Sequence, residues 1–575
     1  MLNNERGSTL LVVMLMVFVF TVLGLSIVAT SIGGAKRTEV RENEVVDNLD
    51  AIKLVNEGVA TIRSYIDQSF DPDEEIAVFS SNLKDFIECK NQDNKDYTCT
   101  NPIQTNNEVT NQTEKSYKIE DITDAENEET KLPLYNIDTS QDYTRVLEVS
   151  AAYSKDKYYK QKVYITAMPS FLKYAIGSRG ALTINGSAYL QGNIYANETL
   201  RISKEAKYIF ESNNYIVKTE LPSFFSTGEN KLMVESGNIQ YCADSCYDSK
   251  HDSIEGNWTN QDVDDIPTFF DPNDPIVSND KLQFVEVDIL NTFIEKLISA
   301  KFSISAIPND LLTEKPNPTA EKKRITDFTH FIKEQININA QANSGSFDKI
   351  TSFNDLRDNS KSVLYQGDAY IDLDNLTLSK DQWLIIDGNA YFESSGTGRM
   401  SISANILVTG DASFKGKFTI DSTMYVLGKA SVDDVDIEKY DNYGSELILM
   451  AQQDLSIARF NKFYDPISKD ETHVDTIDGY LYTATDATVY AIGSYIHVNG
   501  GLFAKGNLEV NAFRGKVTSL PCGAVGETNT SCVRETNVDS SRLIVKNNKK
   551  LFLTQLQGLP RVDKLDVVTD LIEKE

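Results

Sequence analysis

The sequence predicts an α+β fold that is mainly β: one long N-terminal helix, a small β-sheet, and a β-solenoid-like (β-helix) body with a helical insertion. Three observations predict this fold. An uncharged apolar run of about 20 residues lies near the N-terminus. A helical apolar stripe follows it, and a glycine-centred motif then recurs about every 20 residues. With 575 residues, 41% of them apolar, the chain can form several cores.

The chain is strongly acidic, with 56 Lys and Arg against 85 Asp and Glu and a formal net charge of −29. This excess disfavours nucleic acid as a direct partner, because phosphate binding needs a cationic surface. It also disfavours adhesion to anionic lipid through a basic surface. The four histidines leave little material for histidine-based catalysis.

The first predicted element is a membrane span from Leu10 to Ser31. No charged residue occurs between Arg6 and Lys36, and a helix of about 20 apolar residues crosses a bilayer. A cleaved secretory signal is the alternative, but its apolar region usually has only about 7–15 residues. We therefore expect a single-pass membrane protein with the bulk of the chain outside the cytoplasm.

The helical pattern continues beyond the membrane span. Apolar residues recur in steps of three and four, which is typical of an amphipathic helix. This stripe, the expected filament-packing face, consists of Val45, Leu49, Ile52, Val55, Val59, Ile62 and Ile66. One helix over residues 8–69 is therefore predicted, about 90 Å long at about 1.5 Å per residue. Two interpretations fit this helix. It is either a membrane anchor followed by a stalk, or the helix of a filament subunit that packs side by side with other helices.

The start of the chain resembles a type IV prepilin, whose short polar leader ends in Gly directly before the apolar helix. The residues that carry the resemblance are Asn4-Glu5-Arg6-Gly7-Ser8-Thr9-Leu10-Leu11-Val12-Val13. The runs Phe20–Ser26, Asn48-Leu49 and Leu54–Gly58 are similar to PilX-type minor pilins, so that the resemblance covers residues 1–66. It implies a leader over residues 1–7, cleavage between Gly7 and Ser8 by a prepilin peptidase, and N-methylation of Ser8.

One departure from the major pilins is informative. They carry Glu at the fifth mature position, which is Val12 here. A carboxylate in lipid is costly unless it is paired, so its absence fits a subunit that starts or caps a filament. The resemblance thus implies a non-enzymatic minor pilin or pseudopilin of a type IV pilus or related filament, displayed on the cell surface and acting at the tip in assembly initiation or adhesion.

The implied partners are other pilins or pseudopilins, the pilus assembly machinery, the prepilin peptidase and, before assembly, membrane lipid. A surface glycan or host ligand is a further candidate for the β-rich body. The alternative is a membrane-anchored adhesin or carbohydrate-binding β-helix protein, and the third hypothesis is a polysaccharide-active enzyme.

Residues 70–170 are predicted to form a polar loop and a small pilin-like β-sheet. Thr144–Ala151 and Lys160–Thr166 alternate like the two strands of an antiparallel hairpin. In pilins such a sheet packs against the exposed half of the long helix. We therefore expect it to bury the apolar stripe.

The β-rich body is predicted in two parts, residues 171–284 and the repeats over residues 346–540. The motif has an apolar residue, Gly, a polar residue, Ala and a second apolar residue; its copies are Ile184–Leu190, Tyr365–Ile371, Ile386–Phe392, Val408–Phe414 and Val426–Val432. The glycines at 367, 388, 410 and 428 are 21, 22 and 18 residues apart. This period indicates a β-solenoid, with Gly at positive-φ corners and Ala in the narrow interior. An antiparallel sandwich with similar turns is the alternative.

Two insertions and a C-terminal segment complete the domain prediction. A helical insertion over residues 285–345 follows from the helical spacing in Asp288–Ile298 and Ala320–Ile336. A second insertion is expected at residues 438–480. Residues 541–575 form a C-terminal strand and tail, in which Leu565, Val567, Val568 and Leu571 are expected to cap the open end of the stack.

The cysteines form three local pairs: Cys89 with Cys99, Cys242 with Cys246, and Cys522 with Cys532. An even count at short spacings behind a membrane span favours disulfides in an oxidising exterior. The alternative is a zinc site with Cys242, Cys246 and His251, but the spacing is not typical of zinc. We expect no metal.

No enzyme signature is convincing, and no cofactor is expected. The chain has no His-Glu-x-x-His, Gly-x-Ser-x-Gly or Cys-x-x-Cys motif, and the four histidines, His251, His330, His473 and His497, stand alone. Asp433, Asp434 and Asp436 form the best acidic cluster, which a polysaccharide-active enzyme could use. Aspartate also recurs at the predicted corners, at Asp368, Asp387 and Asp411, so a structural role is favoured. Calcium bound by surface carboxylates is an alternative, but the sequence has no Asp-x-Asp-x-Asp-Gly loop.

Overall fold

The structure is a computed structural model that divides into two compact units. The first comprises residues 1–125, 145–165 and 567–575, and the second comprises residues 126–144 and 166–566. The residues that the structure describes are 6–70, 76–88, 117–125, 144–154, 157–166, 169–225, 231–262, 269–270, 276–278, 287–342, 345–356, 361–379, 381–396, 398–440, 446–465, 474–522, 531–548, 558–560 and 565–574.

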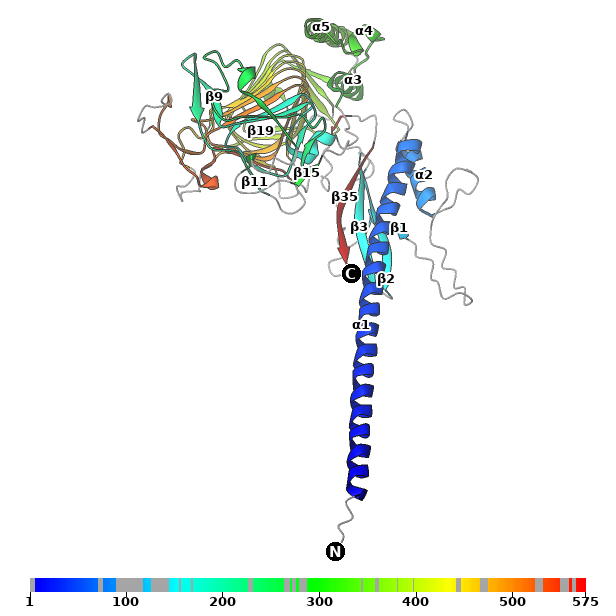
Figure 1. Cartoon of the computed structure of the whole chain (residues 1–575). Helices are drawn as coiled ribbons and strands as arrows, with labels where there is room; N and C mark the ends of the chain where they lie inside the picture. The colour runs from blue at the N-terminus through cyan, green and yellow to red at the C-terminus, as the bar shows by residue number, and fades with distance from the viewer. Residues whose placement is uncertain are drawn as a thin grey trace. The chain divides into compact units, whose positions relative to one another are not determined.

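The first unit is built on α1 (Arg6–Ser69), one continuous helix of 64 residues (Figure 1). At about 1.5 Å per residue it is about 96 Å long, so the predicted long helix is confirmed. A second helix, α2 (Ile76–Glu88), packs beside its C-terminal end, where the rings of Tyr65 and Phe86 stack with centroids 4.0 Å apart. The polar loop expected here is wrong over α2, because its apolar residues have helical spacing that the polar composition of the region masks.

A four-stranded sheet completes the first unit. Its order is β1 (Tyr117–Asp121), β2 (Thr144–Ser154), β3 (Lys157–Thr166) and β35 (Asp566–Lys574). β1 and β2 are antiparallel, and two residues join β2 to β3, which makes that pair a hairpin. Because β35 comes from the C-terminus, residues 166–566 of the second unit are inserted in the chain between two neighbouring strands of this sheet, β3 and β35.

The C-terminal strand corrects one prediction. Val567, Val568 and Leu571 belong to β35 in the sheet of the first unit, and so they do not cap the β-rich body. The sequence of this segment shows a short alternation of apolar residues, which indicates a strand but does not specify the strand with which it pairs.

The second unit is a stack of short parallel strands in three columns. Column one consists of β16 (Asp348–Ile350), β17 (Val363–Gln366), β20 (Trp383–Asp387), β23 (Asn405–Val408), the end of β24 (Ala412–Val426), β26 (Leu447–Ala451), most of β28 (Thr476–Thr483), the end of β30 (Ile496–Ala504), β4 (Tyr174–Ser178), β7 (Asn193–Ala196), β12 (Lys231–Val234) and β15 (Ile276–Ser278).

Columns two and three follow in the same order along the stack. Column two consists of β18 (Ala369–Ile371), β21 (Ala390–Glu393), the starts of β24 and β25 (Ala430–Lys439), β27 (Leu455–Ala458), β29 (Ala487–Ala491), β31 (Leu508–Ala512), β5 (Ala181–Gly186), β8 (Thr199–Ser203) and β13 (Ile239–Cys242). Column three consists of β19 (Asn375–Thr377), β22 (Met400–Ser403), parts of β24, β25, β28 and β30, then β34 (Leu543–Lys546), β6 (Tyr189–Gln191) and β11 (Ser223–Phe225).

Consecutive strands of each column pair in parallel, one coil apart, so the antiparallel sandwich is excluded for this stack. Three pairs of described strands in this unit are antiparallel. β14 (Thr259–Gln261) pairs with β13. β9 (Glu205–Phe210) pairs with β10 (Asn213–Lys218), and β32 (Gly515–Val517) pairs with β33 (Cys532–Arg534). Buried apolar residues of all three columns fill the interior.

The order of coils in the stack differs from their order in the chain. The last coil lies directly against the first, because β30, β31 and β34 pair with β4, β5 and β6. At this join the Phe503 ring covers Gly177, where a Cβ atom would lie 2.5 Å from the ring. The ends of column one are β15 and β16, which follow one another among the strands.

The predicted helical region carries the chain from β15 to β16, at the two ends of the stack. It contains α3 (Ile289–Ser299), α4 (Asn309–Leu312) and α5 (Pro318–Ala342). α5, with 25 residues, is about 37 Å long. Phe293, Phe328 and Ile332 of these helices are buried in one cluster with outward residues of column one, so the connection covers the outer face of that column.

The motif glycines act mainly through close contact between coils. Of the glycines at 367, 388, 410 and 428, only Gly367 has positive φ, at 113°. A Cβ atom on Gly388 would lie 2.2 Å from the carbonyl oxygen of Gly367, and one on Gly428 would lie 2.5 Å from that of Gly410. The predicted positive-φ role is therefore wrong for three of the four. The motif alanines stack inside as expected, with Ala369, Ala390, Ala412 and Ala430 in register.

The second insertion, expected at residues 438–480, is wrong over β26 (Leu447–Ala451) and β27 (Leu455–Ala458). Within that range β26 and β27 are regular members of columns one and two. Polar residues around these two short strands hid the alternation. Residues 541–575 likewise do not form a single terminal piece, since β34 lies inside the stack and β35 in the other unit.

Candidate functional site

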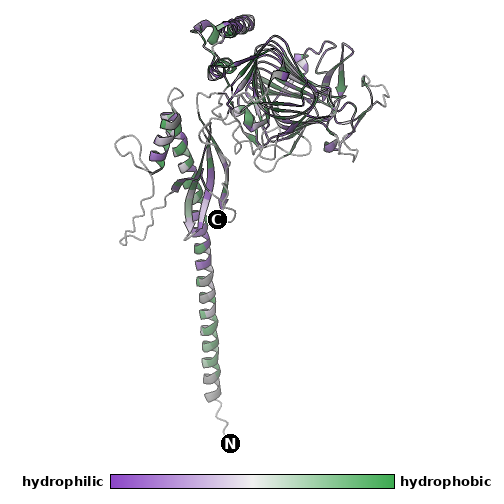
Figure 2. Cartoon of the chain, turned by 180° about the vertical axis from the view of Figure 1, so that it is seen from behind, coloured by the Kyte–Doolittle hydropathy of each residue, from purple (hydrophilic) through white to green (hydrophobic). Residues whose placement is uncertain are grey.

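The N-terminal part of α1 presents apolar side chains on all sides. Every side chain from Val12 to Val28 is exposed, with Phe18 at 68% and Phe20 at 70%. Figure 2 shows this part mainly in the hydrophobic colour. Among the described residues, α1 is the helix that is long and apolar enough to cross a membrane. Apolar surface in water costs about 25 cal/mol per Å², so this segment can serve as a membrane anchor.

The sheet of the first unit covers only the C-terminal part of the predicted stripe. Val55, Val59, Ile62 and Ile66 are buried, together with Ala51 and Tyr65. Ile52 is half-buried. Val45 and Leu49 are 57% and 61% exposed, so the expectation that the sheet buries them is wrong. Only the C-terminal part of the stripe is therefore covered within this unit.

Gly58 fixes how closely α1 approaches the sheet. A Cβ atom on this residue would lie 2.5 Å from Cγ1 of Val149 and 3.0 Å from Cδ2 of Tyr117. The hydroxyl groups of Thr61 and Tyr117 are hydrogen-bonded at 3.0 Å next to this contact. The sequence singled out Gly58 only as part of the pilin resemblance, and the structure assigns it a packing role.

The covered part of α1 ends near Asn48. Its side-chain oxygen accepts hydrogen bonds from the Tyr159 hydroxyl and from Nζ of Lys574, both at 3.2 Å. The Lys574 ammonium also lies over the Tyr153 ring, 4.5 Å from its centroid. The last strand of the chain therefore contacts the helix at the point beyond which the apolar stripe becomes exposed.

The expected processing site lies at the start of the same helix. α1 begins at Arg6, so Gly7 and Ser8 have helical backbone, while residues 1–5 lie outside the described part. The predicted span from Leu10 to Ser31 lies wholly within α1. Val12 is half exposed.

Two of the three cysteine pairs are joined as disulfides, Cys242 with Cys246 and Cys522 with Cys532. Cys89 and Cys99 lie outside the described residues. The first disulfide takes up both sulfur atoms of the alternative zinc site, and His251 instead places Nε2 2.9 Å from the carbonyl oxygen of Tyr215.

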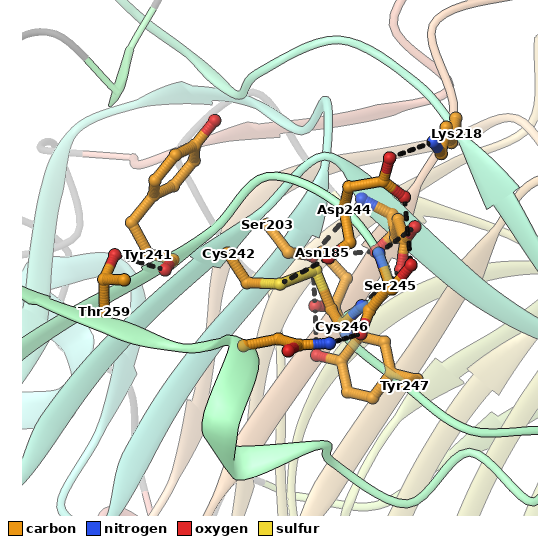
Figure 3. Close-up of a disulfide and its surroundings, with 12 residues drawn as sticks. Asn185, Ser203, Lys218, Tyr241, Cys242, Asp244, Ser245, Cys246, Tyr247 and Thr259 are labelled. Atoms are coloured by element: carbon orange, nitrogen blue, oxygen red, sulfur yellow. Dashed lines mark hydrogen bonds and ion pairs between the residues drawn. A yellow bond between two sulfur atoms is a disulfide. The ribbon is translucent and has the colours of Figure 1, made fainter.

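A buried carboxylate organises the loop closed by the first disulfide. Glu205 accepts hydrogen bonds from the backbone N–H groups of Ser245 and Cys246, both at 2.8 Å. Asp244 on this loop forms an ion pair with Lys218 at 2.7 Å (Figure 3). The backbone N–H groups of Ser245 and Cys246 and the Asp244 carboxylate are thus engaged by the protein itself, which favours a structural role.

The acidic cluster is divided among structural contacts. Asp436 is buried, forms an ion pair with Arg399 and accepts the backbone N–H of Thr476 at 3.1 Å. Asp433 accepts from the Ser431 hydroxyl at 2.8 Å. Burial and, next, the nearby Asp436 raise the pKa of Asp475.

Aspartates at the corners of the stack also have structural partners. Asp368 Oδ1 accepts the backbone N–H of Asn389 at 2.9 Å, and Asp411 Oδ1 accepts that of Lys429 at 2.8 Å. Asp387 accepts from the Thr409 hydroxyl at 3.2 Å. These side chains join one coil to the next. Within the described residues no group of three His, Cys, Asp or Glu could hold a metal ion.

The remaining histidines do not come together. His330 lies on α5 and His497 on β30, and His473 lies outside the described residues. Burial lowers the pKa of His497 to about 4. Burial also lowers the pKa of His251.

A cavity of about 260 Å³ lies between the helical region and column one; its lining includes Leu290, Leu312, Arg324, Thr485 and Lys505. Its charged groups are already paired. Arg324 binds Glu321 through two nitrogens and donates to the carbonyl oxygen of Leu311 at 2.6 Å, and Lys505 pairs with Glu314. The arrangement favours a packing contact over a ligand site.

Comparisons with known proteins do not show a family for this chain. No protein-family model matches this chain, and no curated protein matches it. Among solved structures, the competence-associated pilin ComZ from Thermus thermophilus is similar at 10% sequence identity, over 92% of this chain and 97% of that chain, with a TM-score of 0.24. A similarity at this level does not carry a functional conclusion, which has to come from the chain itself.

Proposed function

We propose that this chain is a pilin-like, non-enzymatic subunit that is anchored in a membrane by α1 and later packs α1 among other helices in a filament. The β-rich body would be displayed on the cell surface, near the filament tip. The observation that carries the proposal is the division of α1 into one part covered by its own sheet and one part left exposed.

The length of the exposed part favours a second partner besides lipid. Apolar side chains are exposed from Val12 to Ile32, about 31 Å of helix, which matches a bilayer core of about 30 Å. Val45, Val46 and Leu49 are exposed beyond that length. Lipid tails do not reach them when the span is centred, whereas neighbouring helices in a filament would cover both segments.

The finer assignment to the PilX-type minor pilins rests on the sequence pattern over residues 1–66. The partners would be other pilins or pseudopilins, the assembly machinery and the prepilin peptidase. Val12 at the fifth mature position supports a subunit that starts or caps the filament. The two disulfides support an oxidising exterior for the body.

We also assign the body to the β-solenoid class. Its support is the parallel, in-register pairing of strands one coil apart in three columns. Such stacks expose strand edges at their ends, which folded proteins cover or charge.

Mass spectrometry of the mature N-terminus tests the main proposal. Expressed with a prepilin peptidase, the chain should begin at N-methylated Ser8, and Gly7→Ala should leave the leader in place. Gly34→Ala is the matched control, because a Cβ atom there meets nothing within 4 Å, and its processing should be unchanged. An unprocessed wild-type chain, or cleavage after the apolar segment, would refute the assignment.

A further inference from the structure

Two tyrosines project side by side from the outer face of column two. Tyr370 of β18 is in register with Tyr391 of β21. Their neighbours Ala369, Ile371 and Ala390 are buried in the interior. Because side chains alternate along a strand, both tyrosines point outward, and their rings stack with centroids 4.7 Å apart and planes 10° from parallel.

Tyr370 contributes little to the packing of the stack. Its residue is 73% exposed, so that only one face of its ring, the face toward Tyr391, is covered. Among the described strands, β18 is the terminal strand of column two, and it pairs with β21. The second ring face therefore points away from the following coils.

Small hydroxyl side chains continue the same outward line along column two. Behind Tyr391 the residues in register are Ser413, Ser431, Ser456 and Thr488. All four are at least partly accessible. With strands about 4.8 Å apart, the line from Tyr370 to Thr488 is about 24 Å long. It contrasts with column one, whose outward side chains are covered by α3 and α5.

The two carboxylates beside Tyr370 favour a neutral ligand over a polyanion. Asp368 and Asp372 lie two residues before and after Tyr370 and are exposed. Asp368 accepts one backbone hydrogen bond and Asp372 accepts from Ser395, which leaves further lone pairs on each carboxylate. Carboxylates here repel polyanions and accept hydrogen bonds from hydroxyl groups.

We propose that this face of column two is a binding site for a neutral glycan, with one sugar ring stacked on the free face of Tyr370. The apolar C–H face of the sugar would cover the ring, Asp368 and Asp372 would accept its hydroxyl protons, and the serine and threonine line would contact further sugars. The proposal goes beyond the filament role, because it does not depend on where α1 is located.

The full-length chain tests this in a detergent without sugar headgroups, such as a polyoxyethylene ether. It is passed over chitin, cellulose and mannan beads, and over heparin beads as the polyanion. We expect retention on at least one neutral polysaccharide and none on heparin. Tyr370→Ala should weaken that retention about fivefold or more, the loss expected from uncovering one aromatic face, and Tyr370→Phe should retain it.

Tyr440→Ala is the matched control, because Tyr440 is a partly exposed tyrosine, 39% exposed, outside this line. It should bind as the wild type does. Since Tyr370 is so exposed, its alanine variant should show the circular dichroism spectrum of the wild type. The proposal is overturned if no neutral polysaccharide retains the chain, if heparin does so better, if Tyr370→Ala binds normally, or if that variant instead abolishes self-association seen in the wild type.

Discussion

The side-chain amide of Gln161 on β3 donates a hydrogen bond of 2.8 Å to the backbone carbonyl oxygen of Asp570 on β35. These residues are 409 positions apart, and the whole β-rich body lies between them in the chain. Arg63 of α1 donates to the carbonyl oxygen of Val567 on the same strand at 3.3 Å. The last strand therefore ties the C-terminus to the helix-bearing unit.

Removal of residues 566–575 should destabilise the first unit and leave the β stack folded. β3 would lose the strand beside it, and its backbone groups would become a free edge. Hydrogen exchange followed by mass spectrometry should show faster exchange in β3 and in α1 around Ile62, with unchanged protection in β24.

Gln161→Ala removes one hydrogen bond of this contact and should cost about 1 kcal/mol. Glu573→Gln, an exposed position of β35, is the control and should change stability by less than about 0.5 kcal/mol. If the truncated chain exchanges at wild-type rates in β3, the C-terminal strand does not support the unit.

Local patterns in the sequence predicted the elements whose signal is local. The apolar run and the stripe after it predicted α1, because the period of a helix is visible within a few turns. The Gly-x-Ala motif predicted strands with stacked alanines for the same reason. The helical spacing of Asp288–Ile298 likewise coincides with α3.

Local sequence patterns did not predict which distant strands pair with one another. Nothing near Val567 indicates that its strand joins β3, and nothing near Leu182 indicates that β5 lies against β31. A strand pattern specifies which face is apolar, not which edge it meets. The same limit applies to the candidate site. The sequence predicted the apolar stripe, but it did not predict that Val45 and Leu49 are exposed, because the sheet that covers the stripe ends near Asn48.

Gly58→Ala should destabilise the first unit by about 1–3 kcal/mol. The added methyl group would lie 2.5 Å from Cγ1 of Val149, and such overpacking costs more than the helix propensity it gains, about 1 kcal/mol. Thermal unfolding of the detergent-solubilised chain, followed by circular dichroism at 222 nm, measures the change. Gly34→Ala should not lower stability, and equal behaviour of the two variants would mean that α1 does not approach the sheet this closely.

Gly410→Ala should destabilise the β stack even though Gly410 needs no unusual backbone angle. A Cβ atom there would lie 2.3 Å from Oδ1 of Asn389 and 2.7 Å from the carbonyl oxygen of Gly388, so neighbouring coils would have to separate. The expected cost is about 2 kcal/mol or more, measured by urea unfolding. Gly398→Ala, where nothing lies within 4 Å, should unfold at the wild-type urea concentration. A normal Gly410→Ala variant would contradict the contact role of the motif glycines.

His497 should make the stability of the β stack depend on pH between about 6.5 and 4. Burial, and then the charge of Lys546, lower its pKa from 6.5 to about 4, and its Nε2 atom is buried without a hydrogen-bond partner in the described part of the chain. The folded state therefore binds fewer protons than the unfolded state in this window. Stability is full above pH 6.5 and falls as the pH drops toward 4, by at most about 3 kcal/mol.

Urea unfolding of the wild type and of His497→Gln at several pH values isolates this effect. Carboxylates titrate in the same range, but they contribute equally to both proteins, so the difference between the two curves reports His497 alone. That difference should be constant above pH 6.5 and should shift in favour of the glutamine variant toward pH 4, because glutamine takes up no proton. His330→Gln, at an exposed position of α5, should follow the wild-type curve throughout. Parallel curves for wild type and His497→Gln would show that the imidazole is as easily protonated in the folded protein as in the unfolded chain.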